Sequence, residues 1–327
     1  MVGMRKGNRR LKRVIYRMGH PVLRFFHFLV IACPFGVCSA LAESLGGISY
    51  YFLAKYRKRA MKNLLRVFGR TISRQERARI CRRIARNAFR DIVDIFYSTG
   101  PDQSKIAERI RVTGHEHLEA ALSLGKGVIG VSAHLGNFML LGFGLVRNGY
   151  PANVVTRPVR DPGFEKIMKG YREKQGTNFI LTKPPQECVK AMLKSLRENE
   201  IVCLLVDQAK KRGSIFVDFF ERPTATSITP AVLSLRTGAP IVPVFIVRRG
   251  GGGHQIFIEP AIDVEFSNDN EEKIFRITAE INRIIQAYVE RYPDQWLSWT
   301  VRRWKHKPTH VRIDAQAGVL ERQLLNV

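Results

Sequence analysis

Three continuous apolar stretches place the strongest constraint on the fold of this chain. They cover residues 127–133, 201–206 and 241–247, each has the length of one β-strand, and segments with helical spacing lie between them. Strands that are apolar on both faces are typical of parallel sheets that helices cover on both sides. The sequence therefore predicts an α/β domain whose central sheet is mixed and largely parallel, with helices on both faces.

The other predicted elements fill the intervals around these strands. Shorter strands are predicted at 153–156, 179–181 and 255–259, and helices at 136–148, 164–176, 186–199, 229–237 and 274–292. Two amphipathic helices are predicted within 57–99, with Thr71 or Ser73 as the cap of the second. Four glycines at 250–253 indicate a hairpin loop between strands rather than a phosphate-binding loop.

The chain carries a large excess of positive charge: 54 Lys and Arg against 28 Asp and Glu in 327 residues give a net charge of +26. Because 45% of the residues are hydrophobic, it can bury a core, which excludes disorder as its dominant state. The charge predicts a negatively charged partner, which is nucleic acid, an anionic membrane or an acidic protein. The five cysteines form no C-x-x-C pair, so we predict a reducing compartment, with no disulfide framework and no metal site.

Half of this net charge lies in the first fifth of the chain. Residues 1–66 contain 14 Lys and Arg and a single acid, Glu43. Between two basic clusters, residues 25–42 are largely apolar, with no Lys, Arg, Asp or Glu and a single histidine, His27. This stretch has 18 residues and Pro34 interrupts it. It is therefore borderline for a spanning helix, which needs roughly 20 apolar residues.

The two basic flanks also bear on how this segment meets a membrane. Lys and Arg prefer the cytoplasmic side of a bilayer, so a single crossing would leave one cluster on the unfavourable side. A helix that lies in the cytoplasmic face, or re-enters from it, keeps both clusters at anionic head groups. We therefore expect a basic membrane-anchoring segment at 1–56, an α/β domain at 57–308 and a tail at 309–327. The alternative is a buried helical hairpin of a soluble protein.

Polar residues follow two of the three apolar strands, at the ends where α/β proteins place their working side chains. His134 follows the strand at 127–133, and Asp207 and Gln208 follow the strand at 201–206. A histidine directly before a helix N-terminus stays neutral, because the helix dipole disfavours the cation. Since a neutral imidazole can accept a proton near pH 7, His134 is the candidate general base.

A series of short motifs runs along residues 20–308. In order, they are His134-Leu135-Gly136-Asn137-Phe138, Arg157-Pro158, Tyr171-Arg172-Glu173 with Gly176, Asp207-Gln208, and the segments 216–220, 226–243, 295–299 and 302–305. The series resembles the lipid A biosynthesis (late, or secondary) acyltransferase family, which is related to the lysophospholipid acyltransferases. The resemblance implies the glycerolipid acyltransferase-like α/β fold.

The family moves a fatty acyl group from a thioester of acyl-carrier protein or coenzyme A to a hydroxyl of a lipid. The resemblance implies the same reaction here, with a lipid A precursor or a lysophospholipid as acceptor and no cofactor besides the acyl thioester. It implies anionic membrane lipids, the thioester donor and the lipid acceptor as partners, and no specific nucleic acid. The implied location is the cytoplasmic face of the bacterial inner membrane.

The resemblance assigns catalytic roles to His134, Arg172 and Asp207. His134 would take the proton of the acceptor hydroxyl, whose oxygen attacks the thioester directly; Ser132 is an alternative nucleophile. The amides at the start of helix 136–148, together with Arg172, are candidates for stabilising the oxyanion. Substrate-binding roles fall to Asn137, Arg157, Gln208, Phe219 and Phe220, although the two phenylalanines also fit a core. Trp296, Trp299 and Trp304 fit either the bilayer interface or a packed C-terminal segment.

The chain departs from the family at one position. The family has an acid five residues after the histidine, and this chain has Met139 there. In the family that carboxylate orients the imidazole and stabilises the imidazolium, as in other His–carboxylate pairs. Either another group, such as Asp207 or a backbone carbonyl, orients His134, or the chain binds lipid with little or no transfer. A basic nucleic-acid-binding protein is the remaining alternative, on charge alone.

Overall fold

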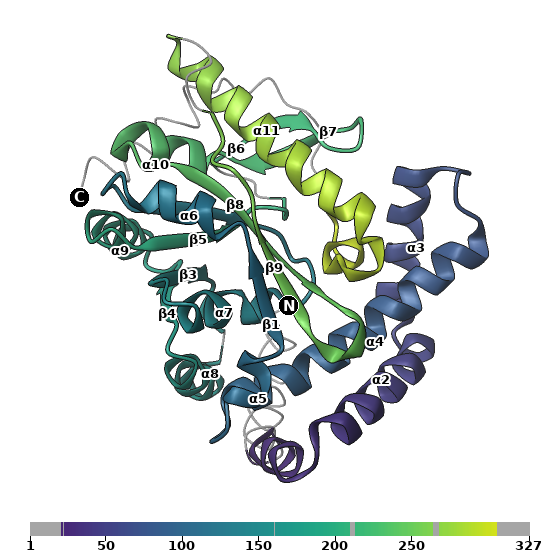
Figure 1. Ribbon diagram of the computed structural model, residues 1–327. Helices are drawn as coiled ribbons and strands as arrows, with labels where there is room; N and C mark the ends of the chain where they lie inside the picture. The colour runs from purple at the N-terminus through teal and green to yellow at the C-terminus, as the bar shows by residue number, and fades with distance from the viewer. Residues whose placement is uncertain (1–20, 22, 160, 210–212, 264–267, 306–327) are drawn as a thin grey trace, which may run out of the picture.

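A seven-stranded sheet forms the centre of the computed structural model, which describes residues 21, 23–159, 161–209, 213–263 and 268–305 (Figure 1). The strand order is β1-β9-β8-β2-β5-β3-β4, and neighbouring strands are parallel except for the antiparallel pair β8–β9. The strands are β1 (Ile110–Thr113), β2 (Val128–Ser132), β3 (Ala152–Thr156), β4 (Asn178–Leu181), β5 (Ile201–Leu205), β8 (Ile241–Arg248) and β9 (His254–Ile258). The predicted mixed, largely parallel sheet is confirmed.

Helices cover both faces of the sheet, as predicted. The helices α9, α10 and α11 pack in one hydrophobic core, and α6 and α7 pack in a second. The helices are α2 (Phe35–Phe52), α3 (Ala54–Phe68), α4 (Arg74–Ser98), α5 (Ser104–Ala107), α6 (His115–Leu122), α7 (Leu141–Arg147), α8 (Pro162–Lys174), α9 (Pro185–Arg197), α10 (Thr229–Thr237) and α11 (Asn270–Arg291). Ser73 caps α4 by accepting a hydrogen bond from the Glu76 amide at 3.0 Å.

The central strands are apolar throughout because they separate these two cores. In β2, Ile129 and Val131 point into the core with α9–α11, whereas Val128 points into the core with α6 and α7. The strand β5 divides its residues in the same way, with Val202 in the first core and Cys203 in the second. Alternate residues of a strand face opposite sides, so burial on both sides leaves no position for a polar residue.

The structure contains strands that the sequence analysis missed. The strand β1 has only four residues, and exposed Arg111 breaks its apolar pattern. The strands β6 (Ser214–Asp218) and β7 (Pro223–Ser227) form a separate antiparallel hairpin. Thr and Ser dominate β7, so it carries no apolar run that would have indicated a strand. The predicted hairpin loop at 250–253 is confirmed, because it joins the antiparallel strands β8 and β9.

The N-terminal part of the described chain is helical. Residues 23–32 are helical and α2 follows after Pro34. Gly46 of α2 packs so closely on α4 that a Cβ there would lie 2.7 Å from the Ala85 carbonyl oxygen. No helix within the described ranges is both long enough and apolar enough to cross a membrane. The basic cluster before residue 21 and the predicted tail at 309–327 lie outside the described residues.

Candidate active site

His134 and Asp207 meet at the carboxyl ends of two adjacent strands. In the parallel register of β2 and β5, Ser132 pairs with Leu205, and each candidate residue follows its strand end by two positions. The two side chains are in contact, with 2.6 Å between His134 Nδ1 and Asp207 Oδ1. The pair therefore joins residues 73 positions apart in sequence.

The Asp207 carboxylate is completely buried and fully engaged. Its second oxygen, Oδ2, accepts hydrogen bonds from Trp296 Nε1 at 2.8 Å and Ser298 Oγ at 2.7 Å. Burial alone would favour the neutral acid, but the contact with His134 and these two donors outweigh it and hold the pKa of Asp207 well below its usual range. An ionised Asp207 only accepts hydrogen bonds, so the proton between the pair sits on His134 Nδ1 and leaves Nε2 free to accept another.

The His134 side chain has access to a cavity. The side chain is 21% exposed and lines the cavity described below. The Phe138 ring meets the imidazole edge-on, with ring centroids 4.7 Å apart. The imidazole is therefore held on one side by Asp207 and on another by Phe138, with its remaining nitrogen available for chemistry.

The segment 295–297 fixes the backbone of the His134 loop. The Leu297 amide donates to the His134 carbonyl at 2.9 Å, and the Gly136 amide donates to the Gln295 carbonyl at 3.0 Å. Gly136 has a positive φ of 53°, and a Cβ at this position would lie 2.2 Å from the Ile246 carbonyl oxygen. Only glycine fits such a close approach to a neighbouring backbone.

The helix predicted at 136–148 begins later than expected. Residues Phe138–Leu140 form a 3₁₀ turn, and the α-helix α7 starts only at Leu141. His134 is therefore not directly before an α-helix N-terminus, and the argument from the helix dipole was wrong. The Gly136 and Leu140 amides donate to the Gln295 and Asn137 carbonyls, so neither is free to stabilise an oxyanion.

A cavity of about 340 Å³ opens beside His134. Its volume falls within the range of small-molecule sites. Apolar side chains line much of it: Ile95, Phe138, Met139, Val154, Val155, Met168, Phe179, Leu204, Leu205 and Val206. Polar side chains form the rest, among them His134, Arg157, Arg172, Gln208, Ser227 and Thr229. The cavity thus combines a surface suited to a hydrocarbon chain with charged and polar groups near the imidazole.

Arg172 is held in the wall of this cavity. Its Nη1 lies 2.6 Å from Glu165 Oε1, and its guanidinium carbon lies 5.2 Å from the centre of the Phe179 ring. The other carboxylate oxygen of Glu165 accepts from the Val159 amide at 2.6 Å. Glu165 therefore ties Arg172 to the segment that follows Arg157. Glu165 was not predicted as a site residue, because a lone acid seven residues before an arginine carries no specific signal.

Three comparisons with known proteins address the identity of this fold and site. Residues 7–306 match the family of bacterial lipid A biosynthesis acyltransferases. The chain belongs to this family. Among the residues that the structure describes, no group of three or more His, Cys, Asp or Glu side chains is placed to hold a metal ion.

Individual known proteins are similar to this chain over different shares of their length. The chain is 28% identical over 197 residues to the phosphatidylinositol mannoside acyltransferase of Mycolicibacterium smegmatis, covering 60% of this chain and 62% of that protein. It spans 48–62% of the mycobacterial relatives that it matches. It is 24% identical over 274 residues to the lipid A biosynthesis acyltransferase of Haemophilus influenzae, covering 82% and 83% of the two chains.

Solved structures were also matched. One of them is the crystal structure of the 1-acyl-sn-glycerophosphate acyltransferase from Thermotoga maritima, with a TM-score of 0.36 and 15% sequence identity. The match covers 77% of this chain and 97% of that one.

The structure separates the predicted site residues of this chain into two groups. His134, Arg157, Arg172 and Gln208 line the cavity, and Asp207 lies behind His134. Asn137, Phe219 and Phe220 do not line it, so the structure does not support the substrate-binding roles expected for them. Asn137 is 0% exposed and bonds to α4, and Phe219 stacks on Trp304 in the core beside Phe220.

The tryptophans predicted for either the bilayer interface or a packed segment are packed. Trp296 and Trp299 are both 0% exposed. Arg303 is also buried, donates to the Ala225 carbonyl at 2.6 Å, and has its pKa lowered to about 10 by burial, against the opposing effect of Asp207. The C-terminal segment therefore supports the site from behind. Ser298, a donor to Asp207, was not predicted as a site residue.

Proposed function

We propose that this protein transfers a fatty acyl group from a thioester to a hydroxyl of a lipid acceptor, with His134 as general base. The observation that carries the proposal is the contact of His134 with a buried, ionised Asp207 at the mouth of a cavity with apolar walls. The contact supplies the orienting carboxylate that Met139 cannot provide. It favours an active enzyme over a catalytically impaired relative.

The reaction needs only groups that the chain and the substrates contain. His134 Nε2 takes the proton of the acceptor hydroxyl while the hydroxyl oxygen forms a bond to the thioester carbonyl carbon. The carbon–sulfur bond of the tetrahedral intermediate then breaks, and the imidazolium returns the proton to the leaving thiolate. Asp207 stabilises the imidazolium between these two steps. Ser132 is buried and does not line the cavity, so nothing places it as a nucleophile.

Arg157 and Arg172 supply positive charge to the polar part of the cavity. We propose that they stabilise the oxyanion or bind a phosphate of either substrate, because guanidinium groups pair well with such oxygens. Gln208, which also lines the cavity, is proposed as a substrate-binding residue.

The acceptor class is proposed from the relatives. They are named as acyltransferases of phosphatidylinositol mannoside or of lipid A biosynthesis. Both are glycolipids, so a glycolipid or a lysophospholipid with a free hydroxyl is the proposed acceptor. Either coenzyme A or acyl-carrier protein carries the acyl group in this proposal. The net charge of +26 suits both an acidic carrier protein and anionic lipids.

We also propose that the protein binds in the plane of the cytoplasmic membrane surface. One face of α2 packs on α4 through Cys38, Ala42 and Gly46, while Val37, Leu41, Leu45, Ile48 and Phe52 of α2 are 52–81% exposed. Phe25, Phe26 and Phe28 in the preceding helical segment are exposed as well. A row of exposed apolar side chains beside basic residues is typical of a helix that lies in a membrane interface.

Transfer of a labelled acyl group tests the proposed reaction. The wild type, His134→Ala and the control His115→Ala are incubated in detergent with radiolabelled acyl-coenzyme A or acyl-carrier protein and a bacterial lipid extract. His115 is a suitable control because it pairs with Tyr150, at 2.8 Å, and does not line the cavity. We expect a labelled lipid with the wild type and His115→Ala only. A product of equal yield from His134→Ala would contradict the general-base role. No product from any protein would instead favour the impaired relative.

A further inference from the structure

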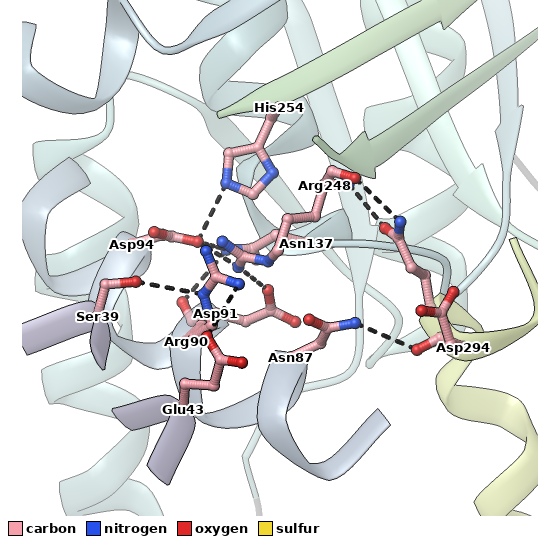
Figure 2. Close-up of polar contacts among 11 residues, drawn as sticks. Ser39, Glu43, Asn87, Arg90, Asp91, Asp94, Asn137, Arg248, His254 and Asp294 are labelled. Atoms are coloured by element: carbon pink, nitrogen blue, oxygen red, sulfur yellow. Dashed lines mark hydrogen bonds and ion pairs between the residues drawn. The ribbon is translucent and has the colours of Figure 1, made fainter. Parts of the chain in front are cut away.

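A second cluster of buried polar side chains lies next to the His134 loop but outside the cavity lining. It consists of Asp91 and Asp94 on α4, Asn137 in the loop, Arg248 at the end of β8 and His254 at the start of β9 (Figure 2). Asn137 and His254 are 0% exposed, Asp94 is 1% exposed and Arg248 is 7% exposed. The proposed reaction uses none of these side chains.

Asp94 is the centre of this buried cluster. Its Oδ2 accepts from His254 Nε2 at 3.0 Å, from Asn137 Nδ2 at 3.2 Å, and from Arg248 Nη2. Asn137 Nδ2 also lies 3.2 Å from the Asp91 carbonyl oxygen, and Arg248 Nη2 donates to the Asp91 carboxylate. The Asn137 amide group is therefore held by α4 through one carboxylate and one carbonyl.

The cluster reaches the same loop by a second route. The Gln295 side chain forms two hydrogen bonds with the Arg248 backbone. The Arg248 amide donates to Gln295 Oε1 at 2.7 Å, and Gln295 Nε2 donates to the Arg248 carbonyl at 3.0 Å. The backbone carbonyl of Gln295 in turn accepts a hydrogen bond from the Gly136 amide. Residues 134–137 are thus fixed at both ends, by Gln295–Leu297 on one side and by Asn137 on the other.

Stability is a poor reason for a buried cluster of this kind. Removing charges from water costs free energy, and replacing a buried ion pair with apolar side chains is often neutral or stabilising. A shared, directional set of hydrogen bonds instead selects one arrangement of the groups that it joins. The loop that it fixes contains His134, whose distance to the reacting atoms must be held within a fraction of an ångström.

We propose that Asn137 is a positioning residue for His134, and that Asp94, with Arg248 and His254, fixes the Asn137 side chain. This inference rests on the proposed role of His134 in acyl transfer. Loss of the Asn137 amide frees the loop 134–137 from α4, so His134 samples positions away from the acceptor hydroxyl. The rate of the chemical step falls, while binding in the cavity is unaffected because Asn137 does not line it.

The test compares Asn137→Ala with Asn153→Ala. Asn153 is a control that is also buried, at 4% exposure, and whose Nδ2 also donates to one carboxylate, that of Glu200, and one carbonyl, that of Ile201. We expect hydrogen exchange of peptides covering 133–141 to rise in Asn137→Ala alone. We expect its kcat with palmitoyl-coenzyme A and a bacterial lipid extract to fall by about 10²-fold with little change in KM for the thioester. Equal exchange and equal kcat in the two variants would overturn the proposal.

A double variant that exchanges the side chains of positions 94 and 137 covers the case in which Asn137→Ala does not fold. Asn137→Asp combined with Asp94→Asn exchanges the amide and the carboxylate but keeps a bond between positions 94 and 137. We expect slower exchange at 133–141 in the double variant than in Asp94→Asn alone; equal exchange would contradict the inference.

Hydrogen exchange requires no turnover, so it separates the two hypotheses. If His134→Ala retains acyl transfer, the proposed function is contradicted, whatever the exchange data show. An inactive His134→Ala beside an Asn137→Ala that matches Asn153→Ala would remove only the positioning role.

Discussion

Asp207 is the residue on which the proposed chemistry depends most directly. Both of its oxygens are engaged, one by His134 and the other by Trp296 and Ser298. Met139, five residues after His134, lines the cavity with 41% of its surface exposed. In the proposed mechanism the carboxylate that orients His134 is therefore that of Asp207, at the end of the neighbouring strand, while position 139 presents an apolar side chain to the cavity.

Replacing Asp207 with Asn tests this arrangement. An amide can donate to His134 Nδ1 and so favours the tautomer with the proton on Nε2, which cannot act as a base. We expect kcat to fall by about 10²–10⁴-fold. The measurement is acyl transfer at saturating thioester, with Asp218→Asn as a control at an exposed position. General acid–base catalysis contributes about 10²-fold or more to the rate. A kcat of Asp207→Asn within about threefold of the control would therefore contradict the role of Asp207.

We also expect Asp207→Asn to change how the thermal stability of the protein depends on pH. The pKa of Asp207 is lower in the folded protein than the value of about 3.9 expected when unfolded. Ionised Asp207 therefore stabilises the fold fully above that unfolded value, and the contribution is lost as the pH falls below it. We expect the difference in thermal stability between wild type and Asp207→Asn to shrink from pH 7 to about pH 3. Thermal unfolding followed by circular dichroism measures it, and a constant difference would contradict the prediction.

At the scale of elements, the pairing of β2 with β5 creates the site. These strands are separated in sequence by the 3₁₀ turn Phe138–Leu140 and by α7, β3, α8, β4 and α9, yet they are neighbours in the sheet. Their parallel register aligns Ser132 with Leu205 and so brings the residues that follow each strand together. The loop after β2 is in turn fitted against β8, where Gly136 meets the backbone of Ile246.

Substitution of Gly136 tests the fit of this loop. Gly136→Ala adds a methyl group that would lie 2.2 Å from the Ile246 carbonyl oxygen, so the loop must move and carry His134 with it. Gly149→Ala is the control, because Gly149 also has a positive φ but a methyl group added there would meet no atom within 4 Å. Both variants lose about 1–2 kcal/mol from the left-handed backbone. We expect only Gly136→Ala to lose further stability and acyl transfer, as measured by thermal unfolding and product formation. Equal losses would show that the close approach is unimportant.

At the scale of the whole molecule, the N-terminal helices place an exposed apolar row on one side of the α/β domain. The helix α2 packs along α4, at the lower right of Figure 1, away from α9 and α10. Lys55, Lys58 and Lys62 of α3 follow this row in the chain, and all three are exposed. The arrangement suits a protein that rests on an anionic surface and takes its acceptor from it.

Vesicle binding tests the exposed row. The combined substitutions Leu41→Ser, Leu45→Ser and Ile48→Ser change side chains that are 54–60% exposed, so the core is preserved. Each half-buried side chain is expected to contribute about 1 kcal/mol to interfacial binding, so the triple variant should bind about 10²-fold more weakly. Co-sedimentation with phosphatidylglycerol-containing vesicles measures the loss. Leu124→Ser, also at a position 60% exposed but in the turn after α6, should bind like the wild type. Unchanged binding of the triple variant would contradict the in-plane association.

The sequence by itself determined the α/β class, the places of the central strands and the family, because these depend on local patterns. Apolar runs reveal strands that are buried on both faces, and the motifs keep their order along the chain. The strand ends also indicated His134 and Asp207 as candidates. The tertiary structure alone decided which of the candidates meet. Strand pairing brought Asp207 into contact with His134. Packing placed Asn137, Phe219 and Phe220 outside the cavity lining. These outcomes depend on register and on contacts between residues far apart in sequence, which no local pattern contains.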